Sequence, residues 1–220
     1  MERLEQIAGA IFDLDGTLLD SMWVWQEVDR RFLARRGIAV PDDYMAAVNA
    51  LEFSAAARYT IDRFALDETP QHLMDEWMEL SRQAYAAEVA LKPHAGDYLR
   101  TLARRGVPLG VATSAAPELF IPALRRCGVY GLFAAFTTTR EVGRGKQFPD
   151  VYLETAKKLG LPASRCAVFE DTLLGIRGAK RGGFLTVGIL EPCSAHEADD
   201  IRREADITAA SFAELLPQPV

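Results

Sequence analysis

The stretch AIFDLDGTLLDS (residues 10–21) joins an apolar run to two aspartates, Asp13 and Asp15, one residue apart. Residues 7–14 lack polar alternation, which is typical of a short parallel strand covered on both faces. Taken alone, the Asp-Gly pair after the run also fits a solvated turn. Whether Asp13 and Asp15 belong to a functional site or only to a turn depends on which other residues the chain places at the end of this strand.

Four further apolar runs resemble strands, and helical patterns ending near glycines lie between them. The runs cover residues 107–113, 132–139, 166–171 and 184–189, and the helices 95–105, 117–127, 150–159 and 173–181. Strands alternating with helices predict an α/β fold, a Rossmann-like, doubly wound parallel sheet. Pro122 fits its helix poorly, because an interior proline removes a hydrogen-bond donor.

Residues 20–89 break this alternation, because only helical patterns occur there. Helices are expected over 22–36, over 54–64 and from Thr69-Pro70 to about residue 88, with Trp25, Val28 and Phe32 on one apolar stripe. The spacing favours packing of Trp25 in the core of this segment. We therefore expect an all-helical cap at 20–89, inserted into a core domain of residues 1–19 and 90–220.

Composition limits the possible partners. The 220-residue chain has a formal net charge of -6, so bulk charge would not attract a nucleic acid or an anionic membrane. Its three cysteines have no CxxC spacing, and the first residues do not resemble a signal peptide, which together favour a cytoplasmic protein. The oligomeric state cannot be read from the sequence, and a monomer is favoured.

Polar side chains collect where the expected strands end. These residues are Asp13 and Asp15, Thr113 and Ser114, Glu170 and Asp171, and, in the loop after the third strand, Lys146. Ligands bind at the carboxyl edge of a doubly wound sheet, so we expect these side chains to meet there. Up to four carboxylates would repel one another, and hard oxygen ligands with this charge suit Mg²⁺.

Each of these residues also has a structural interpretation. Thr113 and Ser114 could cap the following helix, and Lys146 could be a surface lysine. Glu170 and Asp171 could be first-turn acids at a helix N-terminus, an alternative that is stronger for Glu170 than for Asp171.

Four segments resemble, in order, the motifs of the haloacid dehalogenase superfamily of aspartyl-phosphate hydrolases and mutases. They are FDLDGTLLDS (12–21), VATS (111–114), GRGKQFPDVYL (143–153) and VFEDTLLGIRGAKRGG (168–183). The position of the helical insertion resembles that of the beta-phosphoglucomutase-like branch. The match covers nearly all of the core, and four ordered motifs are far more specific than one DxD pair.

The resemblance implies a role for each acid. Asp13 would be the nucleophile that forms an aspartyl-phosphate, and Asp15 the general acid and then the general base. Mg²⁺ would be held by Asp13, the backbone carbonyl of Asp15 and Asp171, with Glu170 orienting metal-bound water.

The resemblance also implies a phosphate site. The hydroxyl of Thr113 and the backbone N–H of Ser114 would bind the phosphoryl group, while Lys146 would neutralise charge and brace Asp13. The expected activity is a Mg²⁺-dependent phosphatase acting on a small phosphorylated metabolite.

Two departures from the family pattern bear on this expectation. Gln147 follows Lys146 where the third motif usually has proline, so the loop backbone is expected to differ there. Residues 20–25 contain no histidine, whereas phosphomutases of this branch carry one in this linker. This favours a phosphatase over a sugar phosphomutase, and a non-catalytic phospho-ligand-binding protein is the third alternative.

Overall fold

The computed structural model describes residues 2–49 and 51–217. The outermost residues of the predicted core range, 1 and 218–220, lie outside this description. The chain divides into two compact units, one made of Met1–Met22 with Val89–Val220 and the other of Trp23–Glu88. The helical unit thus begins at Trp23 rather than at residue 20 and ends at Glu88 rather than at residue 89.

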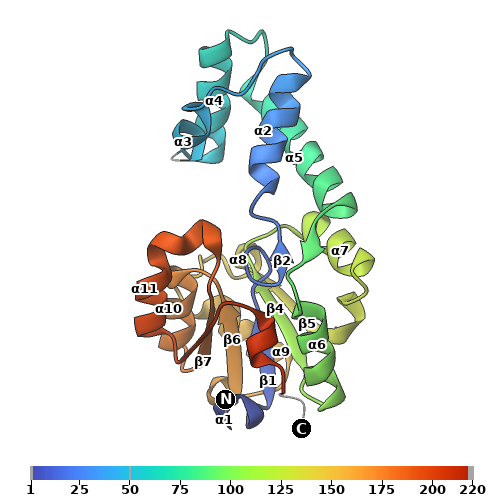
Figure 1. The fold of residues 1–220 in the computed structure, drawn as a ribbon, viewed down its shortest axis with the longest axis vertical. Coiled ribbons are helices and arrows are strands. Elements are labelled where there is room, and N and C mark those ends of the chain that lie inside the picture. The colour runs from blue at the N-terminus through green and yellow to red at the C-terminus, as the bar shows by residue number, and fades with distance from the viewer. Residues whose placement is uncertain (1, 50, 218–220) are drawn as a thin grey trace. The chain divides into compact units, whose positions relative to one another are not determined.

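The first unit is built on a six-stranded sheet with the order β5-β4-β1-β6-β7-β8 (Figure 1). The strands are β1 (Gly9–Phe12), β4 (Leu109–Thr113), β5 (Phe133–Thr138), β6 (Cys166–Glu170), β7 (Leu185–Ile189) and β8 (Ile207–Ala209). Every neighbouring pair is parallel. The predicted α/β, Rossmann-like parallel sheet is confirmed, with β1 at its centre.

Helices cover both faces of the sheet. The helices of this unit are α1 (Glu2–Glu5), α6 (Ala95–Arg104), α7 (Pro117–Arg126), α8 (Thr139–Val142), α9 (Asp150–Lys158), α10 (Leu173–Arg181) and α11 (Ala198–Glu204). Short 3-10 segments are η1 (Tyr130–Leu132), η2 (Ala163–Arg165), η3 (Pro192–Glu197) and η4 (Phe212–Leu215). Helix α7 continues through Pro122, although the sequence predicts a poor fit there.

Successive residues of β1 serve opposite faces, because side chains alternate along a strand. Ile11 joins the core under α9 and α10, which includes Val151 and Ala179. Phe12 stacks on Phe169 with ring centroids 4.4 Å apart, on the face that Tyr98 of α6 covers. Burial on both faces explains why the strand is apolar throughout, and it fixes the point at which Asp13 leaves the sheet.

The second unit contains only helices among its described residues: α2 (Val24–Ala34), α3 (Tyr44–Asn49), α4 (Phe53–Phe64) and α5 (Pro70–Ala87). Helix α5 begins as predicted at Thr69, whose side chain accepts a hydrogen bond from the N–H of His72, with Pro70 at the first helical position. Phe32 packs on Trp77, with ring centroids 5.8 Å apart. The expected burial of Trp25 is wrong, since this side chain is 43% exposed while Phe32 is fully buried.

Two short strands lie where the chain leaves and re-enters the first unit. Strand β2 (Leu19–Asp20) pairs antiparallel with β3 (Ala90–Leu91), and Leu19 lies opposite Leu91. The prediction that only helices follow residue 20 is therefore wrong at Asp20, which belongs to this strand pair. In the part of the chain that the structure describes, no helix is long and apolar enough to cross a membrane.

Candidate active site

Asp13 is the first residue after β1, and its position is fixed by the sheet. Its backbone N–H donates to the carbonyl of Phe169 on the neighbouring strand, at 3.0 Å, and its side chain is buried. The chain then turns at Gly16, which has a φ of 78°. An alanine Cβ at this position would overlap the Asp171 carboxylate, so glycine is needed for both conformation and space.

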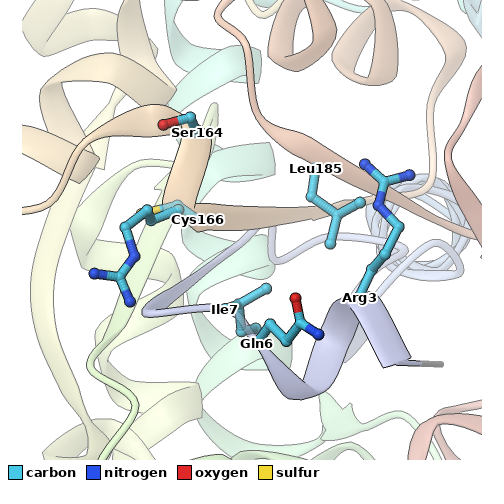
Figure 2. Close-up of a pocket in the computed structure, with 7 residues that line it drawn as sticks. Arg3, Gln6, Ile7, Ser164, Cys166 and Leu185 are labelled. Carbon is cyan, nitrogen blue, oxygen red and sulfur yellow. The ribbon is translucent and has the colours of Figure 1, made fainter.

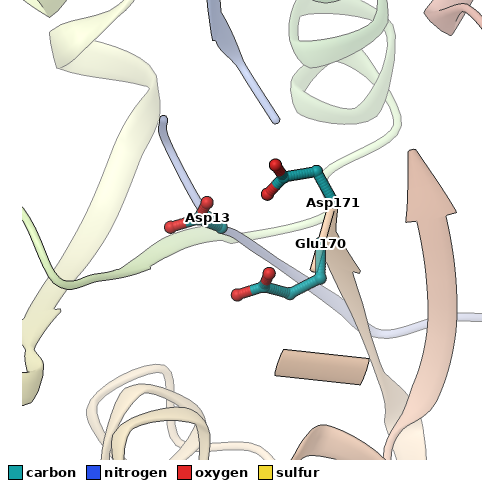
Figure 3. A group of neighbouring side chains, drawn as sticks. All are labelled: Asp13, Glu170 and Asp171. Atoms are coloured by element: carbon teal, nitrogen blue, oxygen red, sulfur yellow. The ribbon is translucent and has the colours of Figure 1, made fainter. Parts of the chain in front are cut away.

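Three carboxylates from the ends of two strands gather at this edge of the sheet. Asp13, Glu170 and Asp171 each place an oxygen within 4.8 Å of the others, and all three residues are buried (Figure 3). Asp15 is not part of this group. Its carboxylate accepts a 2.6 Å hydrogen bond from the Ser21 hydroxyl instead. The sequence expected as many as four acids together, and the fold brings three.

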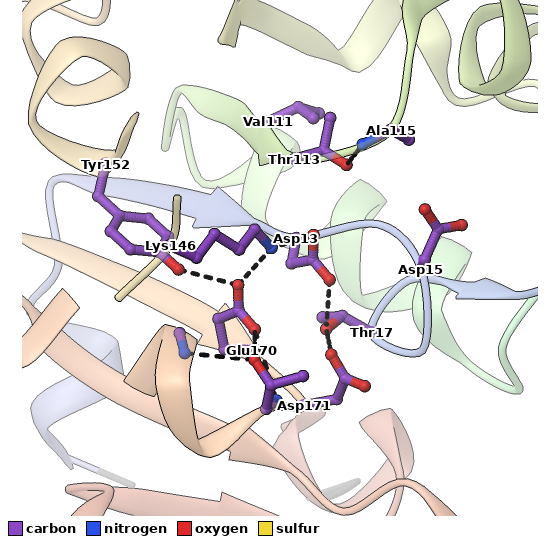
Figure 4. A network of polar contacts seen from close by, with 12 residues as sticks. Asp13, Asp15, Thr17, Val111, Thr113, Ala115, Lys146, Tyr152, Glu170 and Asp171 are labelled. Atoms are coloured by element: carbon purple, nitrogen blue, oxygen red, sulfur yellow. Dashed lines mark hydrogen bonds and ion pairs between the residues drawn. The ribbon is translucent and has the colours of Figure 1, made fainter. Parts of the chain in front are cut away.

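Lys146 connects two of these acids. Its ammonium group forms ion pairs with Asp13 Oδ1 and Glu170 Oε1 (Figure 4). Glu170 Oε1 also accepts a hydrogen bond from the hydroxyl of Tyr152, at 2.9 Å, and its Oε2 accepts one from the hydroxyl of Thr172, at 3.1 Å. Both oxygens of Glu170 are therefore occupied by protein donors, which positions Lys146 against Asp13.

The hydroxyl of Thr17 lies between the other two acids. It is 3.3 Å from Asp13 Oδ2 and 3.1 Å from Asp171 Oδ1. One hydroxyl carries one proton, so it can donate to only one of these oxygens at a time. Asp13 and Asp171 thus keep acceptor capacity that Glu170 does not have.

The remaining predicted residues, Thr113 and Ser114, follow the adjacent strand β4. Thr113 is buried, and its hydroxyl accepts a hydrogen bond from the N–H of Ala115, at 3.0 Å (Figure 4). Ser114 is exposed. Thr113 lies at the same sheet edge as Asp13, because β4 pairs with β1 in parallel.

Two glycines let α10 pack closely against the acidic site. A Cβ at Gly175 would overlap the carboxylate of Glu170, and a Cβ at Gly178 would overlap the backbone carbonyl of Lys146. This explains Gly175 and Gly178 of the fourth motif as packing requirements. The sequence reasoning missed Thr17 and Tyr152 as members of the network, although each lies inside a recognised motif.

The electrostatics follow from three buried acids and one ammonium group. Burial raises the pKa of Asp13 well above its usual value; Lys146 lowers it, and Glu170 and Asp171 raise it further. Burial, with Glu170, raises the pKa of Asp171 to about 7, although Lys146 and Thr17 act in the opposite direction. Burial alone would lower the pKa of Lys146, but attraction to Asp13 and Glu170 raises it. The ammonium group stays charged, and the raised pKa values of Asp13 and Asp171 reflect the cost of ionising three buried carboxyls beside a single cation.

This donor set fits a divalent metal ion. Carboxylate oxygens are hard ligands, and the acceptor capacity of Asp13 and Asp171 is directed to a common region. A cation there would balance the charge that Lys146 leaves uncompensated. The three-acid group can therefore hold a metal, with Asp13 and Asp171 as the better-placed ligands.

A different cavity, of about 190 Å³, lies at the amino edge of the same sheet (Figure 2). It is lined by residues that precede or begin β1, β6 and β7, among them Arg3, Ile7 and Cys166. Arg3 pairs with Asp206 at 3.2 Å, and burial raises the pKa of the Cys166 thiol to about 11. The cavity therefore offers no activated nucleophile, unlike the carboxyl edge.

Comparison with known proteins agrees with this geometry. Residues 7–183 match the family model described as haloacid dehalogenase-like hydrolase. Validoxylamine A 7'-phosphate phosphatase of Streptomyces hygroscopicus subsp. limoneus is 31% identical over 211 residues, 94% of each chain. Fructose-1-phosphate phosphatase YqaB of Escherichia coli is 29% identical and covers 84% of this chain and 97% of its own.

The fold has close structural counterparts as well. The crystal structure of beta-phosphoglucomutase from Clostridium difficile superimposes with a TM-score of 0.67, covering 96% of this chain and 93% of the other at 17% identity. The chain belongs to the haloacid dehalogenase-like hydrolases. Within that family it is a phosphoric monoester hydrolase, the class to which the two relatives named above belong.

Proposed function

We propose that this protein is a Mg²⁺-dependent phosphatase that hydrolyses a small phosphorylated metabolite, a sugar phosphate foremost, through an aspartyl-phosphate on Asp13. The observation that carries the proposal is the contact between Lys146 and Asp13, with Glu170 holding the lysine from the other side. The names of the two curated relatives support a phosphorylated sugar as substrate. The cytoplasm is the proposed compartment.

In the first step, an oxygen of Asp13 attacks phosphorus in line with the ester oxygen. The bond between phosphorus and the ester oxygen breaks, and Asp15 gives its proton to the leaving alcohol. In the second step, Asp15 takes a proton from water, the water oxygen attacks phosphorus, and the bond to Asp13 breaks. Inorganic phosphate leaves, and both aspartates return to their starting states.

The phosphoryl group needs donors while its charge is redistributed. The hydroxyl of Thr113, the backbone N–H of Ser114 and the ammonium group of Lys146 are the proposed donors. Lys146 also keeps the Asp13 carboxylate oriented, and the contacts of Glu170 with Lys146 and Tyr152 support a positioning role for Glu170.

Mg²⁺ would be held by Asp13, Asp171 and the backbone carbonyl of Asp15, with Glu170 at the edge of the site. When bound, it would neutralise negative charge between the nucleophile and the phosphoryl oxygens.

The test is hydrolysis of an aryl phosphate with added Mg²⁺, followed by release of inorganic phosphate. We expect Asp13→Asn to reduce turnover by more than about 10³-fold, since the covalent step is lost. Asp62→Asn, which changes an exposed acid of α4, is the matched control and should leave turnover unchanged. Equal turnover in Asp13→Asn and the parent protein would refute the mechanism.

A further inference from the structure

The helical unit contains a cavity of its own, apart from the phosphate chemistry described above. This helical pocket has a volume of about 260 Å³ and is lined by Trp25, Asp29, Val48, Leu51, Phe53 and Trp77. All of these residues belong to α2, α3, α4, α5 and the segment joining α3 to α4. The volume lies just below the range of about 300–1,000 Å³ typical of drug-sized ligands, so a small molecule would fill it.

One wall of the helical pocket is aromatic. The rings of Trp25 and Phe53 have centroids 5.6 Å apart in an edge-on arrangement, and Phe53 lies 5.6 Å from Trp77. Trp25 and Phe53 are both exposed to more than a third, although each is a large apolar side chain. Aromatic rings that face an open cavity offer the negative face of their π-systems to a ligand.

The pocket also contains a buried acid with little compensation. Asp29 is 7% exposed and is one of the α2 residues that line the pocket. Among the described residues its carboxylate has one hydrogen-bond partner, the hydroxyl of Tyr44 at 3.3 Å, and no ion-pair partner. A buried carboxylate without a cation is costly, so its presence calls for an explanation.

The groups behind Asp29 are hydroxyls and bring no positive charge. The Tyr44 hydroxyl lies 3.3 Å from Asp29 Oδ1 and 2.7 Å from the Thr60 hydroxyl, while Thr60 donates its own proton to the carbonyl of Ala56, at 2.8 Å. The single proton of Tyr44 is divided between Thr60 and Asp29, so the carboxylate receives at most one donor. The indole N–H of Trp77, also in the pocket wall, is a donor and takes no part in binding a cation.

We propose that the helical pocket binds a small organic ammonium group, with Asp29 as its counter-ion and Trp25, Phe53 and Trp77 around its carbon substituents. An alkyl ammonium ion combines apolar carbons, which the rings and Val48 can cover, with the positive charge that Asp29 lacks. A neutral polyol would leave the carboxylate charge uncompensated, and an anion would be repelled by it. The charge of the pocket thus selects a cation over other ligands of the same size.

The first test compares choline with 3,3-dimethyl-1-butanol, its uncharged carbon isostere, by titration calorimetry on the whole protein. We expect choline to bind at least about tenfold more tightly, because the isostere lacks the charge that Asp29 and the rings recognise. Equal binding of the two compounds, or binding of neither, would overturn the proposal. This comparison uses the unaltered protein and needs no variant to fold.

The location of binding is read from the three indole N–H signals in NMR spectra, assigned with Trp→Phe variants. Choline should shift the signals of Trp25 and Trp77, whereas Trp23, which does not line the pocket, provides the internal control. Shifts confined to Trp23 would refute the assigned site.

Two variants test the chemistry. Asp29→Asn keeps the shape of the side chain and should bring the affinity for choline to within about twofold of that for the isostere. Trp25→Ala changes an exposed side chain and should weaken choline binding by about three- to tenfold. Asp62→Asn, on the same unit, is the control and should change neither affinity. A preference for choline that survives in Asp29→Asn would contradict the role of the carboxylate.

Free choline is the probe throughout. Its binding is measured without turnover, so the outcome does not depend on the proposed phosphatase function.

Discussion

The ammonium group of Lys146 is in ion-pair contact with the carboxylate of Asp13, although the whole helical unit lies between the two residues in the sequence. Both side chains are almost fully buried, and Glu170 contacts the lysine as well. Lys146 is therefore a structural partner of two acids as well as a candidate phosphate ligand.

Replacing Lys146 should affect stability and activity together. Lys146→Met leaves Asp13 and Glu170 without their cation, and we expect a loss of about 3–5 kcal/mol in the free energy of unfolding. Turnover of an aryl phosphate should fall by at least about 10²-fold. Urea unfolding and steady-state kinetics measure the two effects. Lys157→Met, at a side chain that is 77% exposed, is the control, and an equal effect there would contradict the special role of Lys146.

Magnesium should stabilise the protein as well as activate it. The three acids exceed the single ammonium group in charge, so a cation that binds them should raise the Tm in a concentration-dependent manner. Asp171→Asn removes one proposed ligand and should weaken Mg²⁺ affinity by at least about tenfold. Differential scanning fluorimetry across a Mg²⁺ series measures both. A Tm that does not respond to Mg²⁺, or responds equally in Asp171→Asn and in a Glu154→Gln control, would argue against this site.

The close approach of α10 to the acids can be tested with one methyl group. Gly175→Ala places a Cβ against the carboxylate of Glu170 and should destabilise the fold by about 1–3 kcal/mol, although alanine is the better helix former. It should also lower turnover, because Glu170 positions Lys146. Gly131→Ala is the matched control, since a Cβ there meets nothing within 4 Å. If both substitutions are neutral, the packing argument fails.

Asp29 should make stability depend on pH. Burial raises its pKa to about 6, while the hydrogen bond from Tyr44 acts in the opposite direction. An aspartate in the unfolded chain has a pKa of ~3.9, so the folded state holds the proton more tightly. The resulting stabilisation is present below pH ~4 and is lost as the pH rises through about 6.

Asparagine carries no charge at either pH, so the stability of Asp29→Asn relative to the parent protein should increase by about 2–3 kcal/mol between pH 4 and pH 8. Urea unfolding at the two pH values gives this double difference, with Asp62→Asn as the reference. A difference near zero would show that Asp29 costs the folded state nothing. A residue that costs stability and serves no packing purpose is typical of a functional site.

The sequence predicted the sheet well because its strands are buried on both faces. The expected runs 107–113 and 166–171 contain β4 and β6, and the helix predicted at 173–181 matches α10. Strand β8 (Ile207–Ala209) was missed, since it has only three residues, two of them partly buried, and carries no long apolar run. A local hydrophobic pattern identifies a strand that is buried on both faces. It is a weak signal for a strand that is only partly buried.

Individual contacts were harder to predict than motifs. Trp25 lies at helical spacing with Val28 and Phe32 but is exposed, because the pattern gives the spacing of a stripe and not its width. Lys92 forms an ion pair with Glu191, a residue almost one hundred positions away in the sequence. Thr17 and Tyr152 contact the acids through hydroxyl groups, and a lone hydroxyl has no sequence signature of its own. Such contacts depend on how segments that are distant in the sequence lie against one another in the fold.

The pairing of β2 with β3 holds the two ends of the insertion next to each other. Leu19 and Leu91 are neighbours across this ribbon, so 71 intervening positions begin and end at one spot on the sheet domain. A whole helical module could be exchanged there for another, or for a tight hairpin, without cutting any strand that carries the acids. Substitutions within the helical unit can then accumulate without altering the strand ends that hold Asp13, Glu170 and Asp171.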